Sequence, residues 1–163
     1  AGDVNKDGFA DIVTGAGAGG GPHVKAFSGT NLSLLHSFFA YNSAFTGGVY
    51  VAVGDLNGDN FADIITGPGV GGGPHVRAFS GVDASVIRNF FAYPVGFNVG
   101  VRVGAMDRNG DGFADIITGP GPGGGPHVRI FDSVTLAVLD NFFAYDPNFL
   151  GGIFVGGQRN RFF

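Results

Sequence analysis

One acidic segment occurs three times in this chain of 163 residues. It reads DVNKDGFAD from Asp3, DLNGDNFAD from Asp55 and DRNGDGFAD from Asp107, so consecutive copies begin 52 residues apart. A fixed period near 50 residues is typical of repeat architectures, in which one unit buries its apolar surface only by stacking on its neighbours. The chain is therefore expected to fold as a row of similar units, each with one acidic loop.

Composition favours strands over helices and narrows the classes of function. The sequence has 32 Gly, 18 Phe and no Glu, and such a composition favours turns and strands. It contains no basic run that would bind nucleic acid and no apolar stretch near the roughly 18 residues that membrane insertion as a helix requires. The absence of Cys excludes disulfides and thiolate metal ligands. The chain begins at Ala1 inside a repeat, which predicts that it was processed or excised from a longer protein.

Each repeat contains four short apolar runs bounded by turn residues. In the second repeat these runs are residues 48–53, 62–66, 75–80 and 85–93. Short runs of this kind are typical of strands. We expect an all-β protein with one four-stranded antiparallel sheet per repeat, the sheets being stacked as the blades of a β-propeller. An open β-solenoid or an irregular sandwich is the alternative.

The repeat bounds follow from the period. Residues 1–47 are expected to form a first repeat without its innermost strand, residues 48–99 and 100–151 two complete repeats, and residues 152–163 a spare innermost strand with a C-terminal tail. Residues 158–161 (Gln-Arg-Asn-Arg) fall where a fourth acidic loop would lie and carry no carboxylate. A fourth metal site is therefore not expected.

The acidic segments have the spacing of a loop that wraps a hard cation. Oxygen-bearing side chains stand at alternate positions, and six to eight oxygen ligands with three carboxylates suit Ca²⁺ better than Mg²⁺. We therefore expect three Ca²⁺ sites. The expected ligands are the side chains of Asp3, Asn5, Asp7 and Asp11 with the Phe9 carbonyl, those of Asp55, Asn57, Asp59 and Asp63 with the Phe61 carbonyl, and those of Asp107, Asn109, Asp111 and Asp115 with the Phe113 carbonyl.

Several features separate these loops from other acidic loops. The strand-like flanks and the missing Glu at the twelfth position argue against an EF-hand. Gly8, Asn60 and Gly112 share one position, where a positive φ is expected because Gly and Asn tolerate it best. An Asx-rich hairpin turn without metal is the alternative. In millimolar extracellular calcium, a site with a dissociation constant near 10 μM would stabilise the fold by roughly 2.7 kcal/mol, which predicts a structural role and an extracellular or cell-surface location.

These segments resemble the FG-GAP repeat, the blade of integrin α-subunit propellers and of related bacterial calcium-binding proteins. The segments TGAGAGGGP at Thr14, TGPGVGGGP at Thr66 and TGPGPGGGP at Thr118 also resemble the glycine-proline segment of that family. The resemblance covers nearly all of residues 1–157. It implies that each calcium loop joins the innermost strand of a blade to the second strand. Members of the family serve in adhesion, ligand binding and sugar binding.

Three blades are few for a closed ring, and the two ends of the chain are complementary. Two copies, each lending its final strand to the first blade of the other, would close a six-bladed ring. The same pairing without closure would give an open polymer. The chain as part of a larger propeller is the remaining alternative. Of these, we expect a homo-oligomer.

Other recurring side chains are expected to serve the fold. They are His23, His75 and His127 as loop anchors, Tyr41, Tyr93, Tyr145 and the Phe pairs 38–39, 90–91 and 142–143 as packing between blades, and Lys25, Arg77 and Arg129 as exposed edge residues or salt links between blades. No Ser-His-Asp set lies outside the repeats, so an enzyme is not expected. The sequence predicts a secreted, calcium-stabilised propeller module with a structural, adhesive or assembly role, open to a protein or carbohydrate ligand. The alternative is a lectin-like propeller that binds carbohydrate between its blades.

Overall fold

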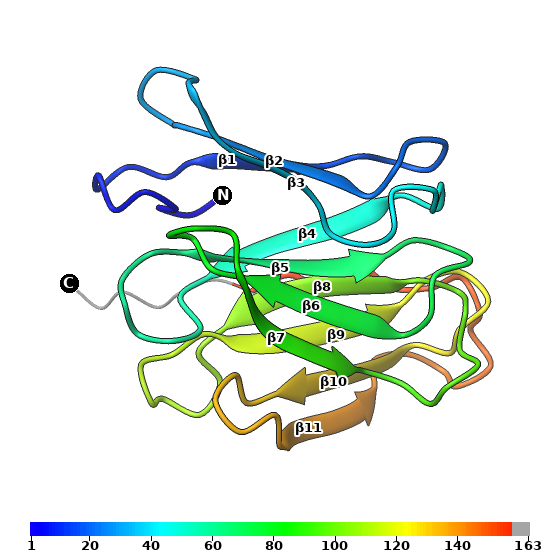
Figure 1. Cartoon of the computed structure of the whole chain (residues 1–163). Helices are drawn as coiled ribbons and strands as arrows, with labels where there is room; N and C mark the ends of the chain where they lie inside the picture. Colours follow the sequence, from blue (N-terminus) through cyan, green and yellow to red (C-terminus); the bar gives the residue numbers. More distant parts are fainter. Residues whose placement is uncertain (158–163) are drawn as a thin grey trace.

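In the computed structural model of the protein, residues 1–157 are placed well enough to be described. This part of the chain forms three antiparallel sheets and contains no helix, so it holds no helical membrane span. The strands are β1 (Ile12–Gly15), β2 (His23–Phe27), β3 (Leu34–Phe39), β4 (Val49–Gly54), β5 (Asp63–Pro68), β6 (His75–Phe79), β7 (Val86–Phe91), β8 (Val101–Met106), β9 (Asp115–Pro120), β10 (His127–Phe131) and β11 (Val138–Phe143). Each sheet is a meander of strands consecutive in the chain (Figure 1).

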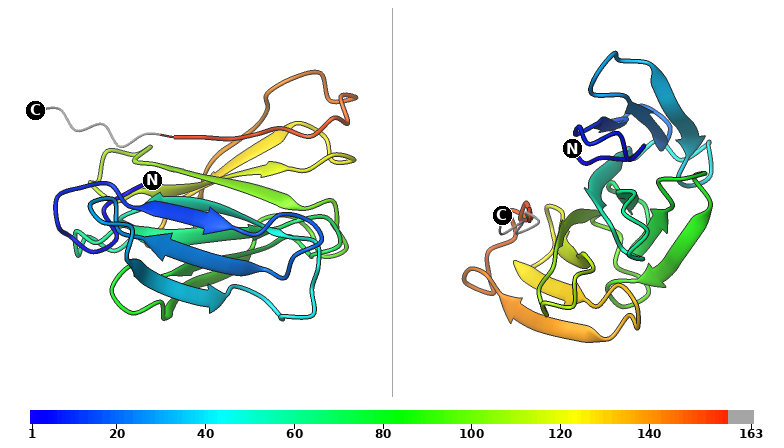
Figure 2. Two further views of the ribbon diagram at one scale, coloured as in Figure 1. Left: turned by 90° about the horizontal axis from the view of Figure 1, so that it is seen from above. Right: turned by 90° about the vertical axis from the view of Figure 1, so that its left-hand side faces the viewer.

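The three sheets follow one another along an open arc. The first sheet contains β1 to β3, the second β4 to β7 and the third β8 to β11. In Figure 2 (right) the N-terminus and the red segment before residue 158 both lie on the concave side of the arc. The expectation of an all-β chain with stacked antiparallel sheets is confirmed, and the arrangement is propeller-like.

Apolar side chains are buried between sheets rather than within one sheet. Val24 and Ala26 of the first sheet form a cluster with Ile64 and Phe79 of the second. A larger cluster joins the second and third sheets, and its members include Leu56, Ile65, Ile116 and Phe131. Burial of apolar area is the dominant favourable term in folding, so each sheet depends on its neighbour for most of its stabilisation.

The three Phe pairs correct one expectation. In the first two pairs only the first ring packs between sheets: Phe38 lies 4.6 Å from Phe79, measured between ring centroids, and Phe90 lies 4.8 Å from Phe131. Both rings of the third pair are exposed. The second ring is exposed, with 57% of Phe91 accessible. Successive side chains of a strand point to opposite faces, so two adjacent Phe residues cannot share one inter-sheet core.

The first sheet lacks the strand that β4 and β8 supply in the other two sheets. This changes the burial of the strand beside the gap. In β5 and β9 every residue is buried, whereas in β1 exposed and half-buried residues alternate. The same position in the repeat thus has two environments, which are set by its neighbours.

The segment 152–157 enters the fold as β4 does. The backbone N–H of Ile153 donates to the carbonyl of Pro120 at 3.0 Å, as that of Val49 donates to the carbonyl of Ala16 at 2.8 Å. Gly152 has φ 73°, close to the 81° of Gly48. No strand is assigned to 152–157, because no further strand of the described chain pairs with it. The sequence expectation for residues 158–161 lies outside the described residues.

Candidate metal sites

Two of the acidic loops join an innermost strand to the second strand of the same sheet. Residues 55–63 connect β4 to β5, and residues 107–115 connect β8 to β9, while residues 3–11 lead into β1. Neighbouring loops are linked by backbone hydrogen bonds: Ala62 N–H donates to Asp3 O, and Ala114 N–H donates to Asp55 O, each at 2.7 Å. The three loops therefore lie side by side at one end of the sheets.

The first Asp of each loop closes the loop onto itself. Asp3 accepts the backbone N–H of Asp7 at 3.0 Å and that of Gly8 at 2.8 Å, one on each carboxylate oxygen. Asp55 likewise accepts from Gly58 at 2.7 Å and from Asn60 at 3.0 Å. The same two hydrogen bonds form at Asp107. Both oxygens of this side chain are thus held toward the inside of the loop.

The Asn and the middle Asp of each loop are oriented in the same way in all three copies. In the second loop Asn57 Oδ1 accepts the Asp59 N–H at 3.0 Å, and Asn57 Nδ2 donates to Asp59 Oδ2 at 3.0 Å. Asp59 Oδ1 in turn accepts the Phe61 N–H at 2.8 Å. Because all three copies share this pattern, the loop geometry is a property of the repeat.

The expected positive φ angles are confirmed. Gly8 has φ 89°, Asn60 67° and Gly112 91°. Lys6, Gly58 and Gly110, two residues earlier, also have positive φ, at 61°, 80° and 80°. Two left-handed residues in each loop turn the chain tightly enough for the backbone N–H groups to reach the first Asp.

The last Asp of each loop has a second role that the sequence analysis missed. Asp63 is fully buried, and it accepts the Leu56 N–H at 2.9 Å and the Gly81 N–H at 3.0 Å. Gly81 belongs to the turn between β6 and β7, so this carboxylate fastens the loop to that turn. Asp11 and Asp115 make the same connection, to Gly29 and Ser133. The signal was present in the sequence as a small residue always 18 positions after this Asp.

These loops concentrate negative charge, and Lys6 Nζ contacts them through the Asp59 backbone carbonyl, at 2.9 Å, rather than through a carboxylate. The ion pair recorded within residues 1–157 joins Arg108 to Asp140 and involves no loop carboxylate. Burial raises the pKa of Asp63 from 3.8 to about 6, and the charges of Asp59 and Asp55 add to this effect. Burial also raises the pKa of Asp115. A bound cation would supply the missing positive charge.

The oxygen atoms present fit a hard cation better than a transition metal. Each loop offers three carboxylates, one amide oxygen and backbone carbonyls, with no sulfur or imidazole ligand, and such a set suits Ca²⁺. Within residues 1–157 no three acidic or His side chains are gathered closely enough to form a metal cluster by themselves. Calcium would therefore need the Asn and carbonyl oxygens as well, and the assignment of three Ca²⁺ sites stays a prediction.

The raised pKa of Asp63 predicts how pH acts on this loop. The folded pKa of about 6 lies above the ordinary 3.8, so the calcium-free protein gains stability below pH 4 and loses it as the pH rises through 6. Calcium needs the ionised form. We expect the calcium concentration at half-saturation to rise up to about tenfold for each pH unit below 6. Calcium titrations at pH 7.5, 6 and 5 measure this, and a constant midpoint would contradict it.

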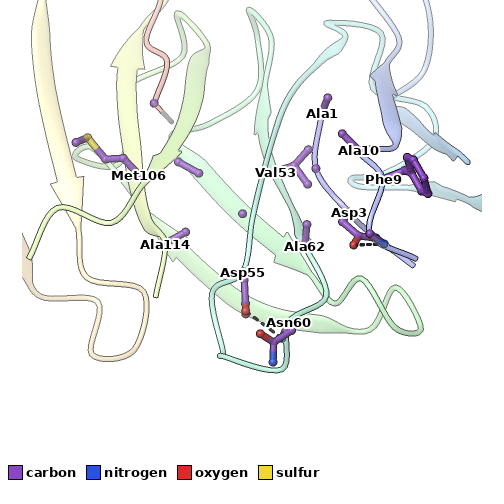
Figure 3. Close-up of a pocket in the computed structure, with 15 residues that line it drawn as sticks. Ala1, Asp3, Phe9, Ala10, Val53, Asp55, Asn60, Ala62, Met106 and Ala114 are labelled. Carbon is purple, nitrogen blue, oxygen red and sulfur yellow. Dashed lines mark hydrogen bonds between the residues drawn. The ribbon is translucent and has the colours of Figure 1, made fainter. Parts of the chain in front are cut away.

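A cavity of about 360 Å³ opens beside the first two loops. Figure 3 shows Asp3 and Asp55 at its edge, with Val53, Ala62 and Met106 along its wall. Gly157 also lines it. The N-terminal residues Ala1 and Gly2 also line the cavity, which lies on the concave side of the arc.

The recurring His residues anchor strands in the described structure. His75 Nε2 donates to Asn89 Oδ1 on the next strand, His127 Nε2 donates likewise to Asn141 Oδ1, and His23 pairs with Ser37. The His23 ring stacks on Phe39 at 4.7 Å between centroids. These contacts lie within single sheets, so the three rings do not meet in one site.

One further acidic residue adjoins the third loop. Asp132 Oδ2 accepts a hydrogen bond from Asn109 Nδ2 at 3.1 Å. Ser28 and Ser80 hold the equivalent position in the other repeats. The contact of Asp132 with the loop depends on the fold, so it could not be predicted from the sequence.

Residues 1–31 match the family model described as FG-GAP repeat. The matched segment contains the first acidic loop with β1, β2 and the start of the following turn. The second and third loops repeat the same residue pattern at the same spacing.

Proposed function

We propose, from the FG-GAP repeat at residues 1–31, that this protein is a calcium-stabilised, propeller-type module with a structural, adhesive or assembly role. The observation that carries the proposal is the acidic loop, which occurs three times with the same inward-facing hydrogen bonds. Fold alone does not determine function. The proposal therefore rests on what these loops can bind.

Calcium, when bound, would supply positive charge and a fixed oxygen coordination sphere. The chain itself supplies two further elements. Backbone N–H groups orient the first Asp of each loop, and the buried last Asp ties the loop to the turn between the third and fourth strands of its sheet. Binding would thus stabilise the region of a blade where the innermost strand, the second strand and this turn meet, which supports a structural role.

A location outside the cell follows from the same chemistry. Sites that stabilise a fold at millimolar calcium stay largely empty at cytosolic calcium concentrations. We therefore place the protein in the extracellular space or at the cell surface.

Calcium stabilisation is tested by thermal unfolding with and without chelator. With a dissociation constant near 10 μM, each site would add roughly 2.7 kcal/mol at 1 mM calcium. Asp59→Asn keeps an acceptor for the Phe61 N–H and removes one ligand charge, so its melting temperature should fall below that of the parent in calcium only. Asp83→Asn is the matched control, because Asp83 lies outside the loops and accepts the Ser85 N–H in the same way. Equal melting of Asp59→Asn and parent in calcium would contradict the assignment.

Self-association is the second part of the proposal. The first sheet lacks an innermost strand, and residues 152–157 have the position of an innermost strand without a sheet. Unpaired strand edges are templates for pairing with another chain. We propose that each copy supplies its final strand to the first sheet of another copy, which gives a homo-oligomer, either a closed dimer or an open polymer.

The lectin-like alternative receives no support from Tyr41 and Tyr93, two of the three recurring tyrosines. The Tyr93 ring is buried between sheets, and Tyr41 donates its hydroxyl to the backbone of the next sheet, to His75 O at 2.7 Å. Neither ring is free to stack on a sugar in a groove between blades. A carbohydrate array probed in calcium would test this alternative directly.

A further inference from the structure

We propose that the two end faces of this chain dock on a second copy through the same side-chain contacts that join its own sheets. This inference rests on the self-association part of the proposed function and names the residues that carry it. The outgoing face is the side of the third sheet that includes Phe142, Ala144 and Tyr145. The incoming face is the side of the first sheet that includes Thr14, Lys25 and Phe27.

The two internal junctions use one set of contacts twice. Tyr93 donates its hydroxyl to His127 O at 2.7 Å, as Tyr41 does to His75 O. In the reverse direction Arg77 Nη1 donates to Ala40 O at 2.8 Å, and Arg129 Nη1 donates to Ala92 O at 2.5 Å. A Phe pair completes each junction, Phe38 with Phe79 and Phe90 with Phe131. Every junction thus joins a Tyr, an alanine carbonyl and a Phe of one sheet to a backbone carbonyl, a basic side chain and a Phe of the next.

Both halves of a third junction are present at the ends of the chain, and both are exposed. On the outgoing face Tyr145 is 65% exposed, whereas the equivalent Tyr93 is 4% exposed. Ala144 is exposed, whereas Ala40 and Ala92 are fully buried. On the incoming face Thr14 is exposed, whereas Thr66 and Thr118 are fully buried. A second copy would therefore receive Tyr145 at its His23 carbonyl and place Lys25 against the Ala144 carbonyl.

The backbone edges predict the register of the same junction. In the complete sheets Val51 pairs with Thr66 and Val103 with Thr118. One period further along the chain, the equivalent residues are Val155 on the outgoing side and Thr14 on the incoming side. Pairing of segment 152–157 with β1 of the second copy would complete a four-stranded sheet from two chains.

At the outgoing face the hydrogen-bond donor comes from a different residue than at the internal junctions. Internally His36 Nε2 donates to Gly81 O at 2.7 Å, and Arg88 donates to Ser133 O. The equivalent residue of the third repeat is Asp140, whose carboxylate has no proton to donate. It forms an ion pair with Arg108 at 2.5 Å instead. Arg108 stands where the first two loops have Val4 and Leu56, so its guanidinium supplies a donor near the same place. The expected acceptor on the second copy is the carbonyl of Gly29.

Lys25 makes the intermolecular junction weaker than the internal ones. Arg77 and Arg129 present a planar guanidinium that is weakly hydrated and suits a partly buried contact. A lysine ammonium is more strongly hydrated, so burying it against Ala144 gains less. The chain thus has its least stable junction where two copies would join, which allows the assembly to open.

Disulfide trapping tests the register, because the native chain has no Cys. Thr14→Cys combined with Val155→Cys should form intermolecular disulfides on oxidation in calcium, giving a covalent dimer or ladder. Thr14→Cys combined with Phe154→Cys is the matched control, since residues 154 and 155 point to opposite faces of the strand. Monomers, intramolecular disulfides or equal cross-linking of both pairs would overturn the proposed pairing.

Association constants test the side-chain contacts. In sedimentation or light scattering in calcium, Tyr145→Phe should weaken association about tenfold through loss of one hydrogen bond, and Lys25→Arg should strengthen it by a similar factor. Tyr93→Phe is the control at an internal junction: it should lower the melting temperature and leave association unchanged. If neither Tyr145→Phe nor Lys25→Arg changes the association constant, the proposed side-chain contacts are wrong, although self-association itself would still hold. A monomer at all concentrations would overturn self-association as well, and the calcium titration would still decide the first part of the proposed function.

Discussion

Replacing Asp63 with alanine is expected to destabilise the protein even when calcium has been removed. The substitution leaves the buried N–H groups of Leu56 and Gly81 without their acceptor. Because an unsatisfied buried donor costs about 1–3 kcal/mol, the free energy of unfolding should fall by about 3 kcal/mol. For a domain of this size that corresponds to a drop in melting temperature of roughly 6–12 °C. Thermal unfolding in chelator at pH 4 measures it. Burial raises the pKa of Asp63 to about 6, so the side chain is uncharged in the folded protein at that pH and its removal relieves little charge burial.

A comparison with Asp59→Asn separates the two roles of a loop carboxylate. Both residues are expected calcium ligands, but Asp59 accepts its hydrogen bonds at the exposed rim of the loop, whereas Asp63 is fully buried. In chelator Asp59→Asn should melt like the parent and Asp63→Ala well below it. If Asp63→Ala lost stability only in calcium, the carboxylate would be a ligand alone, and its connection to the β6–β7 turn would contribute little.

The second large effect is expected where strands of adjacent sheets come into contact. Gly67 lies in β5, and a Cβ added there would overlap the carbonyl oxygen of Val101 in β8. The only relief is to move the second and third sheets apart, which loosens the largest apolar cluster of the chain. Gly67→Ala should therefore lower the free energy of unfolding by about 3 kcal/mol. Denaturant unfolding at equilibrium measures the loss.

Gly73→Ala is the matched control for this prediction. Gly73 lies in the same glycine-rich segment, and a Cβ added there would meet nothing within 4 Å. It should be neutral or slightly stabilising, because alanine restricts the unfolded chain. Equal stability of the two variants would mean that the sheets adapt to a side chain at Gly67, and that backbone contact does not set the spacing of the sheets.

Much of the architecture could be predicted from local sequence. The period of the acidic segments indicated the number of repeats, and the apolar runs between turn residues indicated the meander order of each sheet. The positive φ at Gly8, Asn60 and Gly112 was predictable as well, because few residue types tolerate that conformation. These features depend on properties of one residue or one turn, so they can be recognised without knowledge of the fold.

The features that escaped prediction involve contacts between distant segments. The last Asp of each loop looks like one more ligand in the sequence, yet it is also an acceptor for a turn 18 residues away. The second Phe of each pair looks like core in the sequence, yet strand alternation turns it to the surface. Arg77 and Arg129 link sheets through alanine carbonyls and not through acidic partners. Only the stacking of sheets decides these partners.

The dipeptide Thr-Gly near the end of the second strand of each repeat shows what the sequence determines and what the tertiary structure determines. It occurs at Thr14, Thr66 and Thr118, and by itself it determines a strand followed by a glycine-rich turn in all three repeats. The tertiary structure decides that Thr66 and Thr118 are fully buried and that Thr14 is exposed. The physical reason is that strand formation depends on local backbone preference, whereas burial depends on neighbouring sheets. Thr66 and Thr118 each contact a tyrosine of the preceding sheet, and in the described chain no sheet precedes the first one.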